Sequence, residues 1–89
     1  MTKVKICGIS KVENAQAAVD AGADFVGIVF EPNSRRCVGT EEAKNIIEST
    51  EIGNRTERVL WVGVFANQSV EEVNGIVEYC GIDVVQLSG

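Results

Sequence analysis

Short apolar runs recur along the chain and predict four β-strands. They lie within residues 3–10 and at residues 25–30, 58–65 and 83–87. The second and third runs are almost entirely apolar, which is typical of strands that are covered on both faces. The first run alternates instead, so Lys5 and Cys7 should share one face while Val4 and Ile6 share the other. Gly27, inside the second run, indicates close packing or a tight interior.

Between the strands, residues with helical spacing predict three helices, each begun by a hydroxyl side chain. Ser10 with Glu13, and Ser69 with Glu72, match the capping box that satisfies the first free backbone N–H groups. Thr40 is expected to cap the middle helix. The first helix should run over residues 11–21. The residues expected to face inward are Val12, Ala15, Ala18 and Val19, then Ala43, Ile46 and Ile47, and finally Val70, Val73, Ile76, Val77 and Cys80.

An internal repeat indicates the fold class. The cap, the helix-ending glycine and the next strand all recur after 69 − 10 = 59 positions. The matching pairs are Ser10 and Ser69, Glu13 and Glu72, Gly22 and Gly81, Asp24 and Asp83, and Val26 and Val85. Alternating strands and helices predict an α/β fold with a parallel sheet and right-handed crossovers. The pattern fits either a barrel or an open sheet. The single glycine after the first strand argues against a dinucleotide-binding motif, which needs three.

Composition narrows the class of partner. The 89 residues predict one domain, and 8 basic against 13 acidic residues give a net charge of −5. This charge argues against nucleic acid and against an anionic membrane surface as partners. The three cysteines, an odd number without close spacing, predict reduced thiols. No signal peptide or membrane-spanning run is visible, so we expect a soluble, cytoplasmic protein.

Cys7 is the candidate for chemistry. It lies at the end of the first strand, just before the expected helix N-terminus, a setting that favours thiolate. The chain has no histidine, so proton abstraction would fall to cysteine, aspartate, glutamate or lysine. The alternative is that Cys7 is a small buried packing residue. That packing role is what we expect of Cys37 and Cys80, and we expect Trp61 to lie in the core.

Polar and basic residues near strand ends are candidates for binding. Lys5 shares a face with Cys7, and it could either add positive charge to a site or pair with an interior carboxylate. Arg35 and Arg36 follow the second strand, where they could capture an anion or lie solvated at a loop tip. In the last strand, alternation places Gln86 and Ser88 on one face, so both could point at one interior site.

Five segments, in this order and spacing, resemble the phosphoribosylanthranilate isomerase family. They are Lys5-Ile-Cys-Gly-Ile-Ser10, Gly22-Ala-Asp-Phe-Val-Gly27, Asn33-Ser-Arg-Arg36, Val62-Gly-Val-Phe65 and Asp83-Val-Val-Gln-Leu87. The resemblance runs over the whole chain, and the last strand is most similar to fungal members. Family members are (β/α)₈, or TIM, barrels of tryptophan biosynthesis. The resemblance therefore implies the first half of such a barrel, three βα units plus a fourth strand, as the N-terminal part of one barrel domain.

The resemblance also implies a reaction and a set of roles. The reaction is an Amadori rearrangement of a phosphorylated sugar joined to anthranilate, without a cofactor. Cys7 matches the general base that removes the sugar C2 proton, and Arg36 matches an arginine that contacts the anionic part of the substrate. Gln86 matches a residue beside the anthranilate, whereas Ser88 stands where a histidine is common in the family. The family's acidic general acid and its phosphate-binding loops have no counterpart among these 89 residues.

Two other classes of function stay open. The Cys7-x-x-Ser10 segment resembles half of a thioredoxin-like motif, which would suit a thiol oxidoreductase. Alternatively, the chain is a non-catalytic half-barrel whose first and fourth strands are open edges that pair with a second copy as a homodimer. For the 89 residues alone, without the family's acid and phosphate loops, we expect no isomerase activity.

Overall fold

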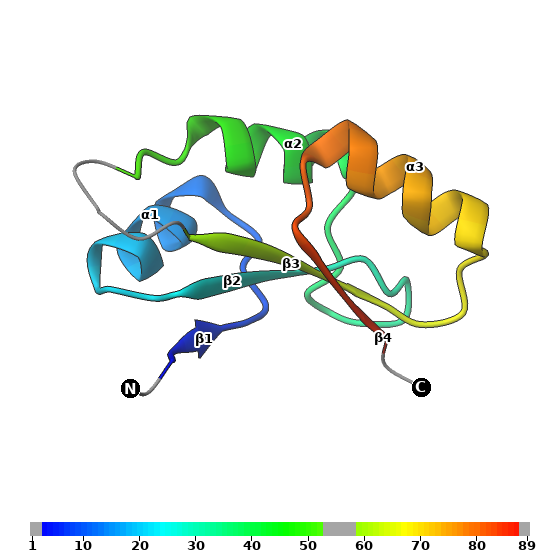
Figure 1. Cartoon of the computed structure of the whole chain (residues 1–89), viewed down its shortest axis with the longest axis horizontal. Coiled ribbons are helices and arrows are strands. Elements are labelled where there is room, and N and C mark those ends of the chain that lie inside the picture. The colour runs from blue at the N-terminus through cyan, green and yellow to red at the C-terminus, as the bar shows by residue number, and fades with distance from the viewer. Residues whose placement is uncertain (1–2, 53–58, 88–89) are drawn as a thin grey trace.

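The computed structural model describes residues 3–52 and 59–87. Its elements in chain order are β1 (Lys5–Ile6), α1 (Val12–Asp20), β2 (Phe25–Val29), α2 (Thr40–Ser49), β3 (Leu60–Phe65), α3 (Val70–Cys80) and β4 (Val84–Leu87). The strands form one parallel sheet in the order β1-β2-β3-β4, and the helices lie on one side of it (Figure 1). The predicted α/β fold with a parallel sheet is confirmed. No helix among the described residues is long and apolar enough to cross a membrane.

The two faces of the sheet differ because side chains alternate along each strand. The register aligns Ile6 with Val26, and Val26 with Trp61, so these three side chains point toward the helices. This helix-covered side is the outer face. Lys5 is aligned with Phe25 in β2, on the opposite side, which is the inner face. The inner face carries the polar residues of the first and fourth strands, and the outer face carries the core.

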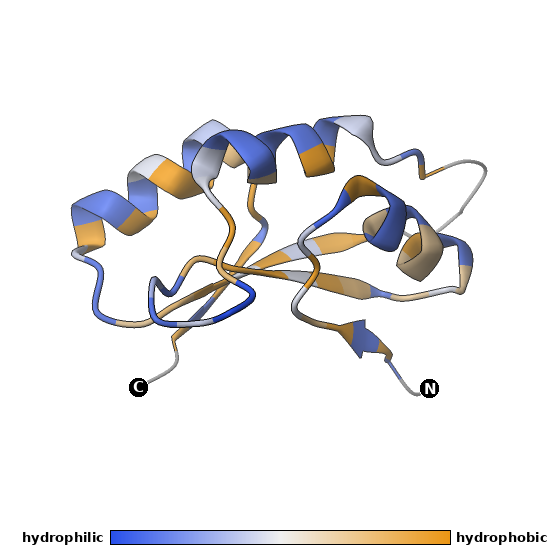
Figure 2. Ribbon diagram, turned by 180° about the vertical axis from the view of Figure 1, so that it is seen from behind, coloured by the Kyte–Doolittle hydropathy of each residue, from blue (hydrophilic) through white to orange (hydrophobic). Residues whose placement is uncertain are grey.

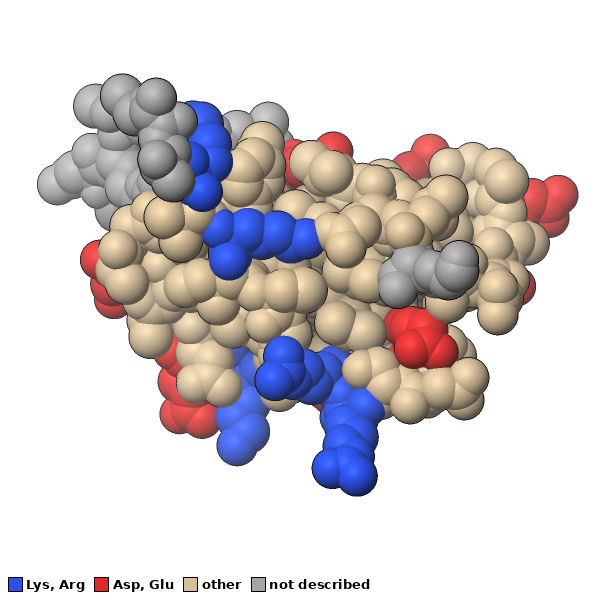
Figure 3. Space-filling view, turned by 90° about the horizontal axis from the view of Figure 1, so that it is seen from below, with Lys and Arg blue, Asp and Glu red and all other residues tan. Residues whose placement is uncertain are grey.

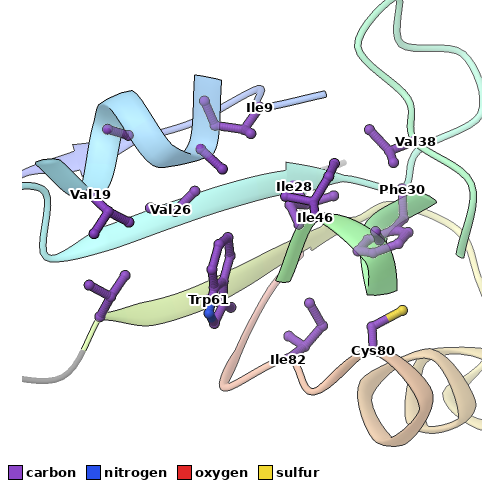
Figure 4. Packing of buried hydrophobic residues seen from close by; sticks show 14 of the residues in the cluster. Ile9, Val19, Val26, Ile28, Phe30, Val38, Ile46, Trp61, Cys80 and Ile82 are labelled. Carbon is purple, nitrogen blue, oxygen red and sulfur yellow. The ribbon is translucent and has the colours of Figure 1, made fainter. Parts of the chain in front are cut away.

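The core fills the space between the outer face and the helices (Figure 4). Trp61, as predicted, is only 6% exposed, and the rings of Phe30 and Phe65 stack with their centroids 5.1 Å apart. The predicted helix faces lie in or against this core, with one exception. Val70, the first residue of α3, is 75% exposed. Figure 2 shows the same division, with hydrophobic central strands and polar outer helix surfaces.

The edge strand β4 is far more exposed than the two central strands, for which cover on both faces was predicted. All four of its residues are exposed, whereas β2 and β3 are largely buried. A groove of about 230 Å³ lies between α3 and β4, and Val73, Val85 and Leu87 are among its lining residues. Leu87, at this groove, is 73% exposed.

The helix starts show which predicted caps form. Ser69 accepts a hydrogen bond from the Glu72 backbone N–H at 3.1 Å, so this capping box is confirmed. The Ser10 cap is wrong: α1 begins at Val12, its N-cap is Lys11, and no side chain caps it. The Thr40 cap is also wrong, because Gly39 takes the extended N-cap position and Thr40 is the first helical residue.

The aspartates of the repeat have equivalent structural roles. The Asp24 carboxylate accepts a hydrogen bond from the Val4 backbone N–H at 2.9 Å, and Asp83 does the same for Trp61 at 2.9 Å. Each aspartate thus ties the start of its own strand to the start of the preceding one. The glycines that precede them, Gly22 and Gly81, take the left-handed conformation, with φ of +95° and +83°. The sequence repeat therefore records a repeated αβ turn.

The two serine motifs give a matched stability test. Replacing Ser69 with alanine should lower the free energy of unfolding by about 1 kcal/mol, because it leaves the Glu72 N–H without its capping acceptor. Replacing Ser10 with alanine should change it by less than about 0.5 kcal/mol, since Ser10 is exposed and caps no helix. Urea denaturation of both variants checks this. Equal losses at the two serines would contradict the difference in capping.

A candidate active site on the inner face

Four residues predicted from the sequence lie on or beside the inner face. Lys5 belongs to β1, Cys7 follows it, Gln86 belongs to β4, and Arg36 comes from the loop between β2 and α2. Seen from below the sheet, Lys and Arg side chains are prominent, and most of the visible carboxylates lie toward the margins (Figure 3). In a chain of net charge −5, this makes the inner face locally suited to an anion.

Cys7 is exposed and lies against the backbone of β2. A Cβ atom added to Gly27 would be 2.9 Å from the Cys7 Sγ and 3.2 Å from its Cα, closer than ordinary contact. The close packing that Gly27 indicated is therefore confirmed, and the group packed against it is the Cys7 thiol. The packing alternative for Cys7 does not fit, because its side chain is open to solvent.

The backbone after Cys7 corrects one part of the prediction. The N–H groups of Gly8 and Ile9 both donate to the Gly27 carbonyl, each at 3.1 Å, so they are not free donors. The helix begins only at Val12. Gly8, with φ of +82°, turns the chain so that this double hydrogen bond forms, which moves the helix start beyond Ser10. Among the described residues, free N–H groups of a helix N-terminus therefore do not adjoin the thiol, and the positive charge packed against this turn comes from another loop.

Arg36 supplies that charge. A Cβ atom added to Gly8 would lie 2.6 Å from both Cδ and Nη1 of Arg36, so the arginine side chain fills the space beside Gly8. The Arg36 backbone N–H donates to Ser34 Oγ at 3.2 Å, which holds the loop locally. Of the two adjacent arginines, the structure thus places Arg36 beside the Cys7–Gly8 turn. Its role in binding stays a prediction, as does that of Arg35, which is exposed.

Lys5 and Gln86 meet across the inner face. The Lys5 Nζ donates to the Gln86 Oε1, which joins β1 to β4 although they are the two edges of the sheet. The alternative in which Lys5 pairs with an interior carboxylate does not fit, because Lys5 is exposed and the partner of its ammonium group is a neutral amide. Its charge is therefore available to a ligand. Ser88, the neighbouring candidate, lies outside the described residues.

Gln68 is a structural residue that the sequence analysis missed. Its Oε1 accepts from the Ala66 N–H at 2.8 Å, and its Nε2 donates to the Phe30 carbonyl at 2.9 Å. It therefore links the loop after β3 to the end of β2, just before the loop that carries Arg36. A polar pocket of about 280 Å³ lies between these two loops. The sequence feature that could have identified Gln68 is its position, directly before the capping Ser69 and shortly after the carboxyl end of a strand.

The two remaining cysteines behave differently from each other. Cys80 is buried as predicted, its thiol donates to the Thr40 carbonyl at 3.4 Å, and burial raises the pKa of Cys80. Cys37 is exposed, so its predicted packing role is wrong. The backbone of Cys37 forms an isolated parallel β-bridge with Val29, and the Cys37 side chain remains exposed to solvent. Among the described residues, no three His, Cys, Asp or Glu side chains are grouped to hold a metal ion.

Comparison with known proteins gives one consistent result. The family model described as N-(5'-phosphoribosyl)anthranilate (PRA) isomerase matches residues 4–89. A relative named N-(5'-phosphoribosyl)anthranilate isomerase from Chlamydia trachomatis serovar L2 is 49% identical over 87 residues, which cover 98% of this chain and 40% of the relative. A relative of the same name from Dehalococcoides mccartyi is 49% identical over 89 residues, covering 100% and 39%. These relatives are bacterial, and the likeness of the last strand to fungal members stays a prediction.

Solved structures agree with the sequence relatives. Monomers generated from the dimeric phosphoribosylanthranilate isomerase of Thermotoga maritima align with a TM-score of 0.88 and 39% identity, covering 100% of this chain and 42% of theirs. A phosphoribosylanthranilate isomerase in complex with reduced 1-(o-carboxyphenylamino)-1-deoxyribulose 5-phosphate aligns with a TM-score of 0.86 and 39% identity, covering 98% and 42%. The chain thus spans about two fifths of the length of the proteins it matches.

The exposure of the three thiols predicts their order of alkylation. Iodoacetamide should modify Cys7 and Cys37 well before Cys80 in the native chain, because Cys80 is buried and its raised pKa keeps it protonated at neutral pH. Peptide mass spectrometry at successive times resolves the three sites, and the urea-unfolded chain is the control in which all three should react. Early modification of Cys80 under native conditions would contradict its placement in the core.

Proposed function

The chain belongs to the phosphoribosylanthranilate isomerase family, and from this we propose that it supplies the general base and the anion-binding arginine of such an isomerase. One observation carries the proposal. The Cys7 thiol, seated against Gly27 at the carboxyl end of β1, has the Arg36 side chain beside the next residue, Gly8. A basic group and a cation are thus held by one turn, at the end of the sheet where parallel α/β folds keep their active sites.

The proposed reaction moves a proton and an electron pair within one molecule. The substrate is N-(5-phosphoribosyl)anthranilate. When its ribose ring opens, the ring oxygen takes a proton and C1 becomes a protonated imine. The Cys7 thiolate then removes the C2 proton, and the C2–H electron pair forms a C1–C2 double bond while the imine nitrogen is neutralised. Ketonisation gives 1-(2-carboxyphenylamino)-1-deoxyribulose 5-phosphate. Oxidation at C2 balances reduction at C1, so the step requires no external oxidant or reductant.

The surrounding residues fit the recognition of such a substrate. The Arg36 guanidinium can present two parallel N–H donors to a carboxylate or phosphate, in addition to its charge. Because Lys5 binds the Gln86 amide oxygen, the amide N–H₂ group is left to donate to a substrate oxygen. Ser88 is proposed as a further contact on the same strand. In this arrangement Cys7 is the catalytic residue, and Arg36, Lys5, Gln86 and Ser88 bind.

The general acid and the phosphate-binding loops must come from residues other than these 89. We therefore propose that the chain acts as the N-terminal part of one barrel domain in the cytoplasm. By itself, it can cover the open edges of β1 and β4 by pairing with a second copy. Self-association is known for the dimeric isomerase of Thermotoga maritima, a protein that this chain resembles. Two copies would present Cys7 twice without adding the missing acid.

A chimaeric barrel tests Cys7 directly. Residues 1–89 replace the matching 42% of the Thermotoga maritima isomerase, so the rest of the barrel supplies the missing residues. We expect isomerase activity, and Cys7→Ser should lower kcat by about 10²–10⁴ with little change in KM, because it removes the base but keeps the side-chain size. Cys37→Ser is the matched control and should keep full activity. A Cys7→Ser chimaera that retains more than about a tenth of kcat would exclude Cys7 as the base.

The same chimaera separates the two arginines. Arg36→Ala should raise KM for N-(5-phosphoribosyl)anthranilate about tenfold or more, as expected for the loss of a charge-assisted hydrogen bond. Arg36→Lys should recover only part of this, because a point charge replaces a planar fork. Arg35→Ala is the neighbouring control and should change neither constant. If the steady-state constants are unchanged in both Arg36 variants, Arg36 does not bind the substrate and is a solvated loop residue.

The isolated chain provides a third test. Light scattering coupled to size-exclusion chromatography should show a dimer, and the same sample should not isomerise N-(5-phosphoribosyl)anthranilate, because the general acid is missing. Lysine substitution at Val85 and Leu87, which are exposed on edge strand β4, should shift the dimer toward monomer. Activity above that of a Cys7→Ala chain would contradict the assignment of the acid to other residues.

A further inference from the structure

We propose that Gly8 is a specificity-determining positioning residue: its missing side chain seats Arg36 against the Cys7–Gly8 turn, so that anions are favoured at the neighbouring thiol. The inference rests on the proposed function for its biological meaning, since an anionic substrate is what the selectivity would serve. It concerns a residue that touches neither the substrate nor the proton, and that acts through Arg36.

The geometry leaves no room for a side chain at position 8. An added Cβ would lie 2.6 Å from the Arg36 Cδ, 2.6 Å from its Nη1 and 3.2 Å from its Nε. Three atoms along the arginine, including two guanidinium nitrogens, therefore occupy the volume of one missing methyl group. Any other residue at position 8 must displace the guanidinium.

A second glycine fixes the thiol at the same place. Gly27 seats the Cys7 Sγ, and its carbonyl accepts the N–H groups of both Gly8 and Ile9 at 3.1 Å. The turn that carries Gly8 is thus held on β2, and it cannot move away from an obstructed arginine without losing these hydrogen bonds. A side chain at position 8 should therefore shift Arg36 while Cys7 stays in place.

Charge selectivity follows from this arrangement. A unit charge about 4 Å from an approaching anion in water contributes about a fivefold preference. The effect acts only on a charged compound, so a neutral compound of similar size and chemistry reports access alone. A selective effect of Gly8 on charged compounds can therefore be told apart from a general structural effect, which would alter the access of the charged and the neutral compound alike.

Iodoacetate and iodoacetamide form the required pair of probes, since both alkylate a thiolate with loss of iodide and differ in charge. The rates at Cys7 are measured by peptide mass spectrometry in the 89-residue chain carrying Cys37→Ser, with buried Cys80 as a reference for unfolding. Gly8→Ala should lower the ratio of the iodoacetate rate to the iodoacetamide rate about fivefold, and Arg36→Ala should lower it equally. The double variant should show no further loss.

Gly22→Ala is the matched control for backbone strain. Gly22 has φ of +95°, close to the +82° of Gly8, but nothing lies within 4 Å of its added Cβ. It should keep the wild-type ratio, as should Arg35→Ala. If Gly8→Ala exposes Cys80, Gly8→Asn replaces it, because asparagine tolerates positive φ better and still displaces the arginine. The same fall in ratio is expected.

Two results would overturn the inference. The first is that Gly8→Ala and Gly8→Asn keep the wild-type ratio although Arg36→Ala lowers it, which would mean that Gly8 does not seat the arginine. The second is an unchanged ratio in Arg36→Ala, which would mean that this charge does not act at the thiol. Failure of the proposed function would be seen in a different experiment, in which the chimaeric barrel would be inactive. An active, Cys7-dependent chimaera with an insensitive ratio would keep the function and discard the role of Gly8.

Discussion

The absence of a side chain at Gly27 is the constraint on which the candidate site depends. This residue is paired with Val62 in the central β2–β3 ladder, so its backbone is held by the most extensive strand pairing in the sheet. Its carbonyl holds the turn after Cys7, and its open Cα seats the thiol. A position in the middle of the fold therefore fixes the position of the proposed base. A β-carbon there would push Cys7 out of the site or β1 away from the sheet.

The division of the sheet into two faces explains how the chain combines stability with chemistry. Apolar residues from β2, β3 and the three helices are buried together on the outer face, where their removal from water stabilises the fold. The inner face is then free to carry Lys5, Cys7 and Gln86, which would be costly inside a dry core. The division is incomplete at β4, where all four residues are exposed and a groove separates the strand from α3.

Much of the fold could be predicted because it is local. Spacing of apolar residues located the strands and helices, and the 59-residue repeat predicted the equivalent turns at Asp24 and Asp83. One error occurred where a distant contact overrode a local motif. Ser10 and Ser69 have the same capping pattern, yet only Ser69 caps a helix, because the double hydrogen bond to Gly27 extends the segment before α1.

The site was less predictable than the fold. The pattern singled out Cys7, which the structure leaves exposed, but it placed a helix N-terminus beside the thiol, where the structure has a turn held on Gly27 with Arg36 packed against it. The approach of Arg36 to Gly8 depends on how the loop after β2 folds back, and the hydrogen bond of Lys5 with Gln86 spans 81 positions. Neither contact leaves a periodic signal. The resemblance to a known family implied the roles, and the structure shows which of these residues lie near one another.

The central claim is that one inner-face site unites the thiol of Cys7 with the charge of Arg36 around a single substrate. A crystal structure of the chimaeric barrel with reduced 1-(o-carboxyphenylamino)-1-deoxyribulose 5-phosphate tests it most directly. The account predicts that the sugar C2 lies within contact distance of the Cys7 Sγ while an anionic group of the ligand is bound by the Arg36 guanidinium. A ligand bound in an ordered position that contacts neither residue would contradict it.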